Sequence, residues 1–169
     1  MTDSMTLDEL TFEVRVSRRR KTIGIIVHRT GRLSLALPYR CPLTAVEAAA
    51  RKKLPWVRRK LAWYTARGRD WVEKRMAIFA PLVGAEPAVL SVRDLGRRWG
   101  SCSAKGKVSF HWQIMLFPPL IADYVIVHEL AHLRELNHGK EYWRLVEAII
   151  PDYRERRAWL AGNGHRHVV

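Results

Sequence analysis

The sequence His128-Glu129-Leu130-Ala131-His132 lies within an apolar stretch, 124–133, and decides how the rest of the chain is interpreted. In a helix, residues four apart lie about 40° apart on one face at roughly 100° per residue, so both imidazoles can reach one metal ion. Glu129 lies beside that face, where its carboxylate can take a proton from a water molecule that the metal activates. The pattern is typical of hydrolytic zinc sites. We therefore expect one catalytic Zn²⁺ held by His128 and His132, with Glu129 as the catalytic residue.

A catalytic zinc site usually has three protein ligands, and His138 is the first candidate for the third. It follows His132 by six residues, which is the metzincin spacing, although Glu135 stands where that pattern has glycine. In a continuous helix His138 would be displaced from His132 by roughly 9 Å, so we expect the helix to end between residues 133 and 137. Glu135 is the rival, either as a ligand or as a group that orients an imidazole. Weaker candidates are Glu141 and Glu147.

The hydropathy pattern predicts a mixed fold. Apolar residues alternate over 12–16, 23–27 and 33–37, which predicts three strands in an antiparallel meander. A capping box at 44–47 opens a helix, Pro55 is expected to start a second segment or kink the first, and a further short helix is expected over 70–79. Strands are predicted again at 89–92, 98–103 and 107–114, with a hairpin turn at 104–106. Helices are predicted from about residue 119 to an end between residues 133 and 137, at 140–150 and at 152–160, the last ended by Gly162-Asn163-Gly164.

These elements indicate an α+β fold with two parts. Residues 1–80 form a basic N-terminal lobe of β-meander and helices, and residues 81–169 form a catalytic lobe, the two packed as one compact unit. Apolar residues within the helical stretch 56–64 are expected in the core rather than as a platform for stacking bases: Trp56, Leu61, Trp63 and Tyr64. His165 and His167 are expected to be exposed to solvent.

Composition and charge limit the cellular compartment and the kinds of partner that we expect for this protein. The chain has two cysteines, Cys41 and Cys102, no apolar run long enough to span a membrane and no visible signal peptide, so we expect a cytoplasmic protein. Its formal net charge is +14, and residues 1–80 carry 18 Lys and Arg against 7 Asp and Glu. Such a basic lobe can hold nucleic acid or an acidic partner, although a solvated surface explains the same charge.

Residues near the predicted hairpin are candidates for contact with a peptide substrate. Trp99, Gly100 and Ser101 precede the turn, and an edge strand there can pair with an extended peptide backbone. A tightly packed sheet corner explains the same small residues equally well. Tyr142 is a further candidate contact. A group that stabilises the oxyanion is also needed, and Tyr142, Arg98 and His111 are the candidates. Cys102 has no evident base partner, which argues against a role as ligand or nucleophile.

Several segments resemble the YgjP-like metal-dependent hydrolases, a family of predicted zinc metallopeptidases related more distantly to the SprT-like zincins. The resemblance rests on Arg98–Ser103 (RWGSCS), Gly106–Phe110 (GKVSF), Pro119, Asp123–Leu133 (DYVIVHELAHL), Asn137–Trp143 (NHGKEYW) and Pro151. It extends over nearly the whole chain, although the N-terminal half is not specific. It implies a zincin-like metallopeptidase domain with His128, His132 and His138 as ligands and Glu129 as the catalytic acid and base. His111 departs from the family, where we expect asparagine.

Three hypotheses follow. The preferred one is a zinc-dependent hydrolase that cleaves amide bonds of a peptide or protein. The second is a zinc protease recruited to nucleic acid by the basic lobe. The third is a domain that a closed, four-ligand zinc merely stabilises.

Overall fold

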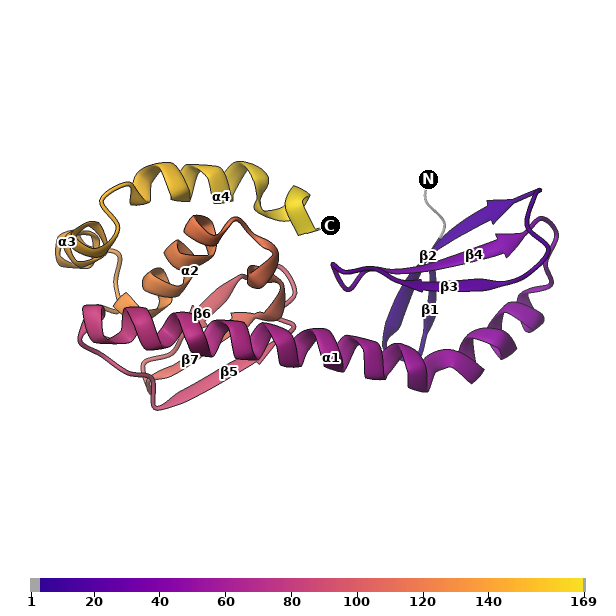
Figure 1. The fold of residues 1–169 in the computed structure, drawn as a ribbon, viewed down its shortest axis with the longest axis horizontal. Coiled ribbons are helices and arrows are strands. Elements are labelled where there is room, and N and C mark those ends of the chain that lie inside the picture. Colours follow the sequence, from indigo (N-terminus) through magenta and orange to yellow (C-terminus); the bar gives the residue numbers. More distant parts are fainter. Residues whose placement is uncertain (1–3, 169) are drawn as a thin grey trace. The chain divides into compact units, whose positions relative to one another are not determined.

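The computed structural model describes the backbone of residues 4–168 and the side chains of residues 4–164 (Figure 1). His165 and His167, predicted to be exposed, therefore have side chains outside the described residues. In chain order the elements are β1 (Ser4–Leu7), β2 (Leu10–Ser17), β3 (Gly24–Val27), β4 (Leu33–Pro38), α1 (Leu43–Val83), β5 (Val89–Arg93), β6 (Gly100–Cys102), β7 (Lys107–His111), the 3₁₀ helix η1 (Trp112–Leu116), α2 (Pro119–Ala131), α3 (Lys140–Ile149) and α4 (Tyr153–Val168).

The chain divides into two compact units, residues 1–64 and residues 65–169, which we call the N-terminal and C-terminal units. The division falls inside α1, whereas the division suggested from the sequence, between residues 80 and 81, lies near the end of that helix. The predicted α+β fold class is confirmed, with four helices and two small sheets among the described residues. None of the described helices combines the length and apolar character needed to cross a membrane.

The sheet of the N-terminal unit has the strand order β1-β2-β4-β3, so the predicted antiparallel meander is wrong. β2 runs parallel to β4, with Val14 opposite Leu35. β3 is antiparallel to β4, and β1 is antiparallel to β2. Five of the six residues of β4 are buried, which is why it occupies an interior position in the sheet. Alternating hydropathy shows which side chains of a strand face the core, but it does not identify the neighbouring strand.

The N-terminal half of α1 completes this unit. Val46, Leu54 and Val57 are buried in one cluster with Phe12 and Leu35 of the sheet. The helix is unbroken through Pro55, which rules out the start of a second segment there and leaves the alternative of a kink, and the separate short helix predicted over 70–79 is part of α1. A proline inside a helix removes one hydrogen bond, and burial of Leu54 and Val57 offsets that loss. The expectation that the aromatic residues here lie in the core is wrong for Trp56 and Trp63, which are 41% and 49% exposed.

The sheet of the C-terminal unit has the order β5-β7-β6. β6 and β7 form the predicted hairpin, with Gly106 in the turn at a φ of +72°, and β5 pairs with β7 in parallel. β6 is an edge strand among the described residues, as expected. The predicted strand 107–114 ends at His111 and continues as η1, whose first backbone N–H, from Gln113, is bound by the His111 side chain.

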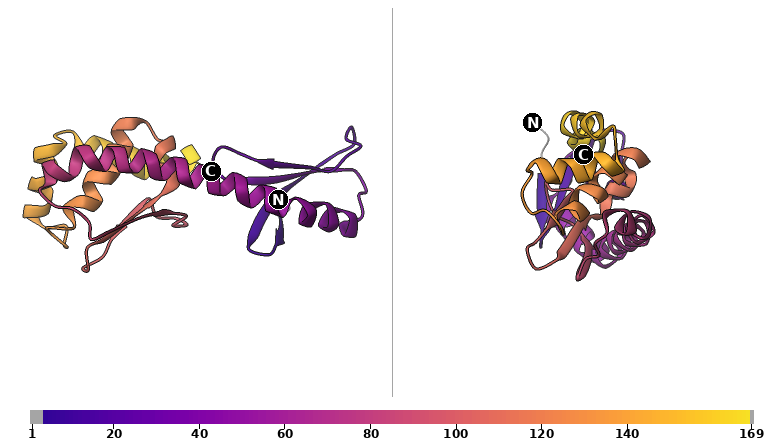
Figure 2. Two further views of the ribbon diagram at one scale, coloured as in Figure 1. Left: turned by 60° about the horizontal axis from the view of Figure 1, so that its bottom comes forward. Right: turned by 90° about the vertical axis from the view of Figure 1, so that its left-hand side faces the viewer.

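α2 is the central element of the C-terminal unit and lies between the sheet and α4 (Figures 1 and 2). Nearly all of its residues from Ile121 to Ala131 are buried, as expected for a helix covered on most of its faces. Pro119 occupies the first turn, as predicted. Asp123 near its start accepts two hydrogen bonds from Arg75 of α1, one of them 2.7 Å long. This ion pair, with the carboxylate buried and the guanidinium partly exposed, fixes α2 against the C-terminal half of α1.

The two remaining helices complete the covering of α2. α3 agrees with its prediction to within one residue. α4 runs past Gly162 and Gly164, so the predicted end at these glycines is wrong. Gly164 lies close to the indole of Trp99, where an added Cβ would come within 3.1 Å of Nε1, so small size rather than turn geometry explains a glycine at this position.

Candidate metal centre

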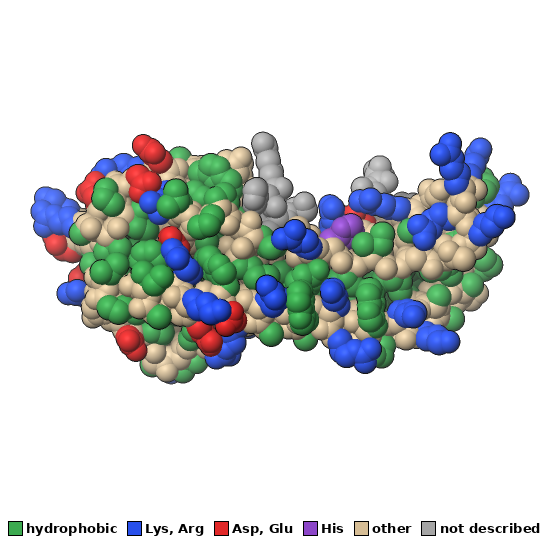
Figure 3. Space-filling model, viewed as in Figure 1, with side chains coloured by type: hydrophobic (Ala, Val, Ile, Leu, Met, Phe, Trp, Pro, Cys, Tyr) green, Lys and Arg blue, Asp and Glu red, His purple; other side chains and the backbone are tan. Residues whose placement is uncertain are grey.

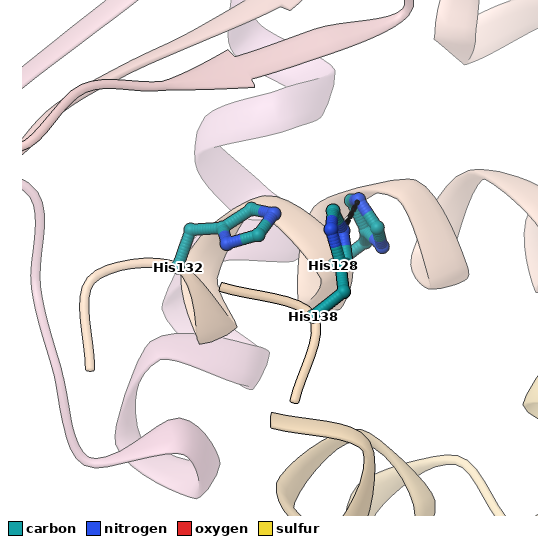
Figure 4. A group of neighbouring side chains, drawn as sticks. All are labelled: His128, His132 and His138. Atoms are coloured by element: carbon teal, nitrogen blue, oxygen red, sulfur yellow. Dashed lines mark hydrogen bonds between the residues drawn. The ribbon is translucent and has the colours of Figure 1, made fainter. Parts of the chain in front are cut away.

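The three histidines named from the sequence meet at one point (Figure 4). α2 ends at Ala131, and His132 caps it. The backbone N–H groups of Leu133, Arg134 and Glu135 bond to the carbonyls of Leu130 and Ala131 and tighten the turn. The chain then reverses before α3 and returns His138 to the helix. Potential ligand atoms of the three side chains all lie within 4.8 Å of one another. α2 thus ends two residues before the predicted interval of 133–137, but the break before His138 that the prediction required is present, and it brings His138 back to the first two histidines.

The second ring nitrogen of two histidines is held by the protein. Nδ1 of His128 lies 2.6 Å from the hydroxyl of Tyr142, and that hydroxyl donates a hydrogen bond of 3.0 Å to the His128 carbonyl. Nδ1 of His132 lies 3.0 Å from the backbone carbonyl of Glu135. A hydroxyl that already donates, and a carbonyl, can only accept from the imidazole. In the neutral form of each ring the proton therefore lies on Nδ1, and Nε2 is the nitrogen available to a metal.

The geometry and chemistry of these groups fit zinc. Nε2 of His128 lies 3.2 Å from Nε2 of His138. Two nitrogens on a tetrahedral zinc at about 2.0–2.1 Å are about 3.3 Å apart. Burial, and then the neighbouring histidines, lower the pKa of His128 to about 3, and the pKa of His138 is also lowered, again chiefly by burial. Neutral imidazoles are the ligands zinc requires, so protons do not compete for these two rings at neutral pH.

The carboxylate of Glu129 is buried beside this centre, with 7% of the residue exposed. Burial raises its pKa to about 7, and the positive charge of Arg98 partly opposes this. A carboxyl group with a pKa near neutrality both accepts and returns a proton efficiently. Gly100 of β6 makes room for it, because a Cβ on Gly100 would lie 2.5 Å from Cγ of Glu129. The sequence suggested that Gly100 lets a substrate backbone approach closely; in the structure, its small size makes room for the side chain of Glu129.

A cavity of about 350 Å³ opens beside Glu129 and His128. Trp99 and Gly100 line it, as a substrate-contact role requires, while Ser101 is paired within the sheet opposite Ser109. The Tyr142 hydroxyl is engaged with His128 instead. Among the candidates for stabilising an oxyanion, Arg98 lines the cavity, whereas the buried His111 faces Asp94 at 3.2 Å.

The rival ligands lie outside the histidine cluster. In the portion of the chain that the structure describes, the cluster contains no histidine, cysteine or carboxylate beyond the three imidazoles. Glu135 contributes its backbone carbonyl to His132, and Glu141 and Glu147 pair with Arg144 and Arg154. Burial, and then the charge of Glu129, raise the pKa of the Cys102 thiol, which agrees with the expectation that Cys102 is neither ligand nor nucleophile.

Sequence reasoning missed the contribution of α4 to this site. Arg157, Leu160 and Ala161 line the cavity, and Tyr124 of α2 joins them. Arg157 follows the last histidine of the cluster by 19 residues and belongs to no recognisable motif. The sequence signal that could have found it is weak, because it is one arginine among several in a basic helix.

Three imidazole nitrogens facing one point, with a buried glutamate beside them, define the site as a candidate metallopeptidase centre within a mixed α+β domain. The family profile described as "YgjP-like, metallopeptidase domain" matches residues 61–163, and the chain belongs to this family. The crystal structure of the metallopeptidase zymogen abylysin from Pyrococcus abyssi is similar, with 25% identity and a TM-score of 0.46, over 50% of this chain and 87% of that one. No curated protein matches the chain.

Proposed function

We propose that the protein is a zinc-dependent peptidase in which His128, His132 and His138 hold the metal and Glu129 transfers the proton. The observation that carries this proposal is the grouping of three imidazoles beside the buried carboxylate of Glu129. Three ligands without a fourth in the described part of the chain favour a catalytic site over a closed structural one, which argues against a merely metal-stabilised domain.

Bound zinc supplies a Lewis acid that polarises the scissile carbonyl and makes water acidic enough to attack near neutral pH. Glu129 accepts the proton of the attacking water, and the same carboxyl group then donates it to the departing amine. Its pKa of about 7 suits both steps. Arg98, at the wall of the same cavity, can stabilise negative charge that develops on the carbonyl oxygen.

The peptide itself has a natural place beside these groups. β6 presents an edge to which an extended substrate can add through backbone hydrogen bonds, and its first residue, Gly100, touches Glu129. A peptide bond held along β6 would therefore lie next to the proton-transferring carboxylate.

The test is the substitution Glu129→Gln in the zinc-loaded protein, with a mixture of unstructured peptides as substrate. We expect the variant to bind one zinc per chain, as the wild type does, and to lose at least about 100-fold in turnover, because the amide cannot accept a proton. Mass spectrometry of the digest and metal analysis give the two readouts. Cleavage by the variant at the wild-type rate would reject the role of Glu129.

A second candidate function is binding of nucleic acid by the N-terminal unit. Figure 3 shows many Lys and Arg side chains and few acidic ones on the visible face of this unit. Trp56 is 41% exposed and shares a groove with Lys52 and Lys53, an arrangement that can stack a base beside phosphate contacts. Binding of a labelled duplex and a single strand at several salt concentrations tests this. No association even at low salt would remove the idea.

A further inference from the structure

Three arginines surround the cavity next to the candidate metal centre. Arg97 and Arg98 precede β6 and come before the histidine motif in the chain. Arg157 belongs to α4, which follows that motif. Arg157 also lines a second space, together with His128, His138 and Trp143, so it borders both the cavity and the histidine cluster. Its guanidinium lies 5.0 Å from the centre of the Trp143 ring. Trp143 stacks in turn on His138 and Tyr153, which holds the arginine near the metal centre.

The positive charges of these arginines are only partly balanced, through the interaction of Arg98 with the carboxylate of Glu129. Within residues 4–164, none of the three guanidinium groups forms an ion pair with a carboxylate, although most other acidic side chains of the C-terminal unit are paired with arginine or lysine. The single acidic residue that lines the cavity is Glu129. The cavity is therefore a region of positive potential with an apolar floor of Trp99, Val125 and Leu160.

We propose that this cavity is a specificity subsite that binds a carboxylate of the peptide substrate, from an Asp or Glu side chain or from the C-terminus, close to the scissile bond. The inference rests on the proposed peptidase function. Guanidinium groups bind carboxylates through paired hydrogen bonds, and an apolar floor suits the methylene groups of a Glu side chain. A volume of about 350 Å³ accommodates one or two residues of a peptide beside Glu129, and a nucleic-acid duplex is far too wide for it.

The test compares matched peptides in the zinc-loaded, full-length protein. One set carries Glu at successive positions with an amidated C-terminus, a second carries Gln at the same positions, and a third has Gln with a free C-terminal carboxylate. We expect kcat/KM to favour one Glu peptide, or the free-carboxylate peptide, over its neutral partner by about tenfold or more, the size of a hydrogen-bonded charge contact. Comparison of the first and third sets identifies which carboxylate is bound. The preference should weaken as salt is added, because the subsite is open to solvent.

Arginine variants locate the preference within the cavity. Arg157→Gln should reduce the ratio of kcat/KM between charged and neutral peptides to near one, mainly through KM, and Arg157→Glu should reverse it in favour of a Lys peptide. The control is Arg154→Gln on the same helix, since Arg154 is exposed and bonded to Glu147. It should keep the full preference. Equal cleavage of charged and neutral peptides by the wild type, or an equal loss on both in Arg157→Gln, would overturn the proposal.

The subsite can also be tested apart from peptidase activity. If the zinc-loaded wild type cleaves no peptide, the proposed function fails, but fluorescence anisotropy with the same labelled peptides still measures binding. Tighter binding of the carboxylate peptide to the wild type than to Arg157→Gln would support the subsite, and equal binding to the two proteins would reject it.

Discussion

A methyl group on Gly100 would lie 2.5 Å from Cγ of Glu129 and 2.6 Å from its Oε1. Gly100 begins the edge strand β6 and pairs with Phe110 of the strand beside it. A Cβ atom essentially never makes a non-bonded contact this short, and the buried Phe110 and α2 leave the sheet little room to move away. The glycine therefore determines where the carboxylate of Glu129 can sit.

Gly100→Ala should move the carboxylate of Glu129 while leaving the three histidines in place. We expect turnover to fall by about 100-fold, because small displacements of a catalytic group have effects of this size. Zinc content should remain at the wild-type value. The control is Gly162→Ala, since an added Cβ at that exposed helical position meets no described atom within 4 Å. Full activity in Gly100→Ala would show that Glu129 is not confined by this contact.

Tyr142→Phe tests whether the hydroxyl on His128 supports metal binding. The change removes the partner of Nδ1 and the donor to the His128 carbonyl, yet preserves the shape of a fully buried ring. Loss of such a partner typically lowers metal affinity by about 10-fold to 100-fold. Competition with a chromophoric chelator gives the zinc dissociation constant. Tyr153→Phe, which alters another buried tyrosine of the same unit, should bind zinc like the wild type; a loss of equal size there would assign the effect to general destabilisation.

Whether His138 or Glu135 is the third ligand can be decided from the zinc content of two variants. His138→Ala removes a nitrogen from the cluster and should reduce bound zinc to a trace after dialysis against metal-free buffer. Glu135→Ala keeps the backbone carbonyl that holds His132, so zinc should remain bound at one ion per chain. Metal analysis of the two proteins decides the matter. The opposite result, zinc lost only in Glu135→Ala, would make the carboxylate the ligand.

The sequence predicted the grouping of the three histidines better than the surroundings of that cluster, for a physical reason. The four-residue spacing of His128 and His132 dictates a shared helix face, and the place of His138 follows from the end of that helix. By contrast, Arg157 reaches the cavity only through the packing of α4 on α2. No local pattern encodes that packing. The position of the Tyr142 hydroxyl, which was expected to face substrate, likewise depends on how α3 docks.

Errors in the fold have the same origin. The local conformational preferences of Pro55 and Gly162 predict breaks in the helices at these residues. However, α1 runs on through Pro55, where neighbouring side chains are buried, and α4 runs on past its glycines. In the N-terminal sheet, alternation correctly marked the strands around Val14 and Leu35, while their parallel pairing depended on contacts between distant segments. Local signals therefore predicted most elements of the fold, and tertiary packing decided their ends and neighbours.

His111 gives a prediction for the dependence of stability on pH. It is 3% exposed, its Nδ1 accepts the backbone N–H of Gln113 at 3.2 Å, and its Nε2 lies 3.2 Å from Asp94. Nδ1 therefore carries no proton, and Nε2–H donates to the carboxylate. A second proton on Nδ1 would break the bond to Gln113 and place a charge in the interior. Burial accordingly lowers the pKa of His111 below its ordinary value, although Asp94 opposes the shift.

The sign of the effect follows from the two states. In the unfolded chain His111 takes up a proton below about pH 6.5, whereas in the folded protein it stays neutral to a lower pH. The unfolded state then binds more protons, so the free energy of unfolding falls as the pH drops from about 6.5 toward the folded pKa. His111→Asn keeps an acceptor for Gln113 but does not titrate. Urea unfolding of both proteins in EDTA at pH 7.5 and pH 5 should show a larger loss of stability in the wild type; equal losses would mean that His111 titrates alike in both states.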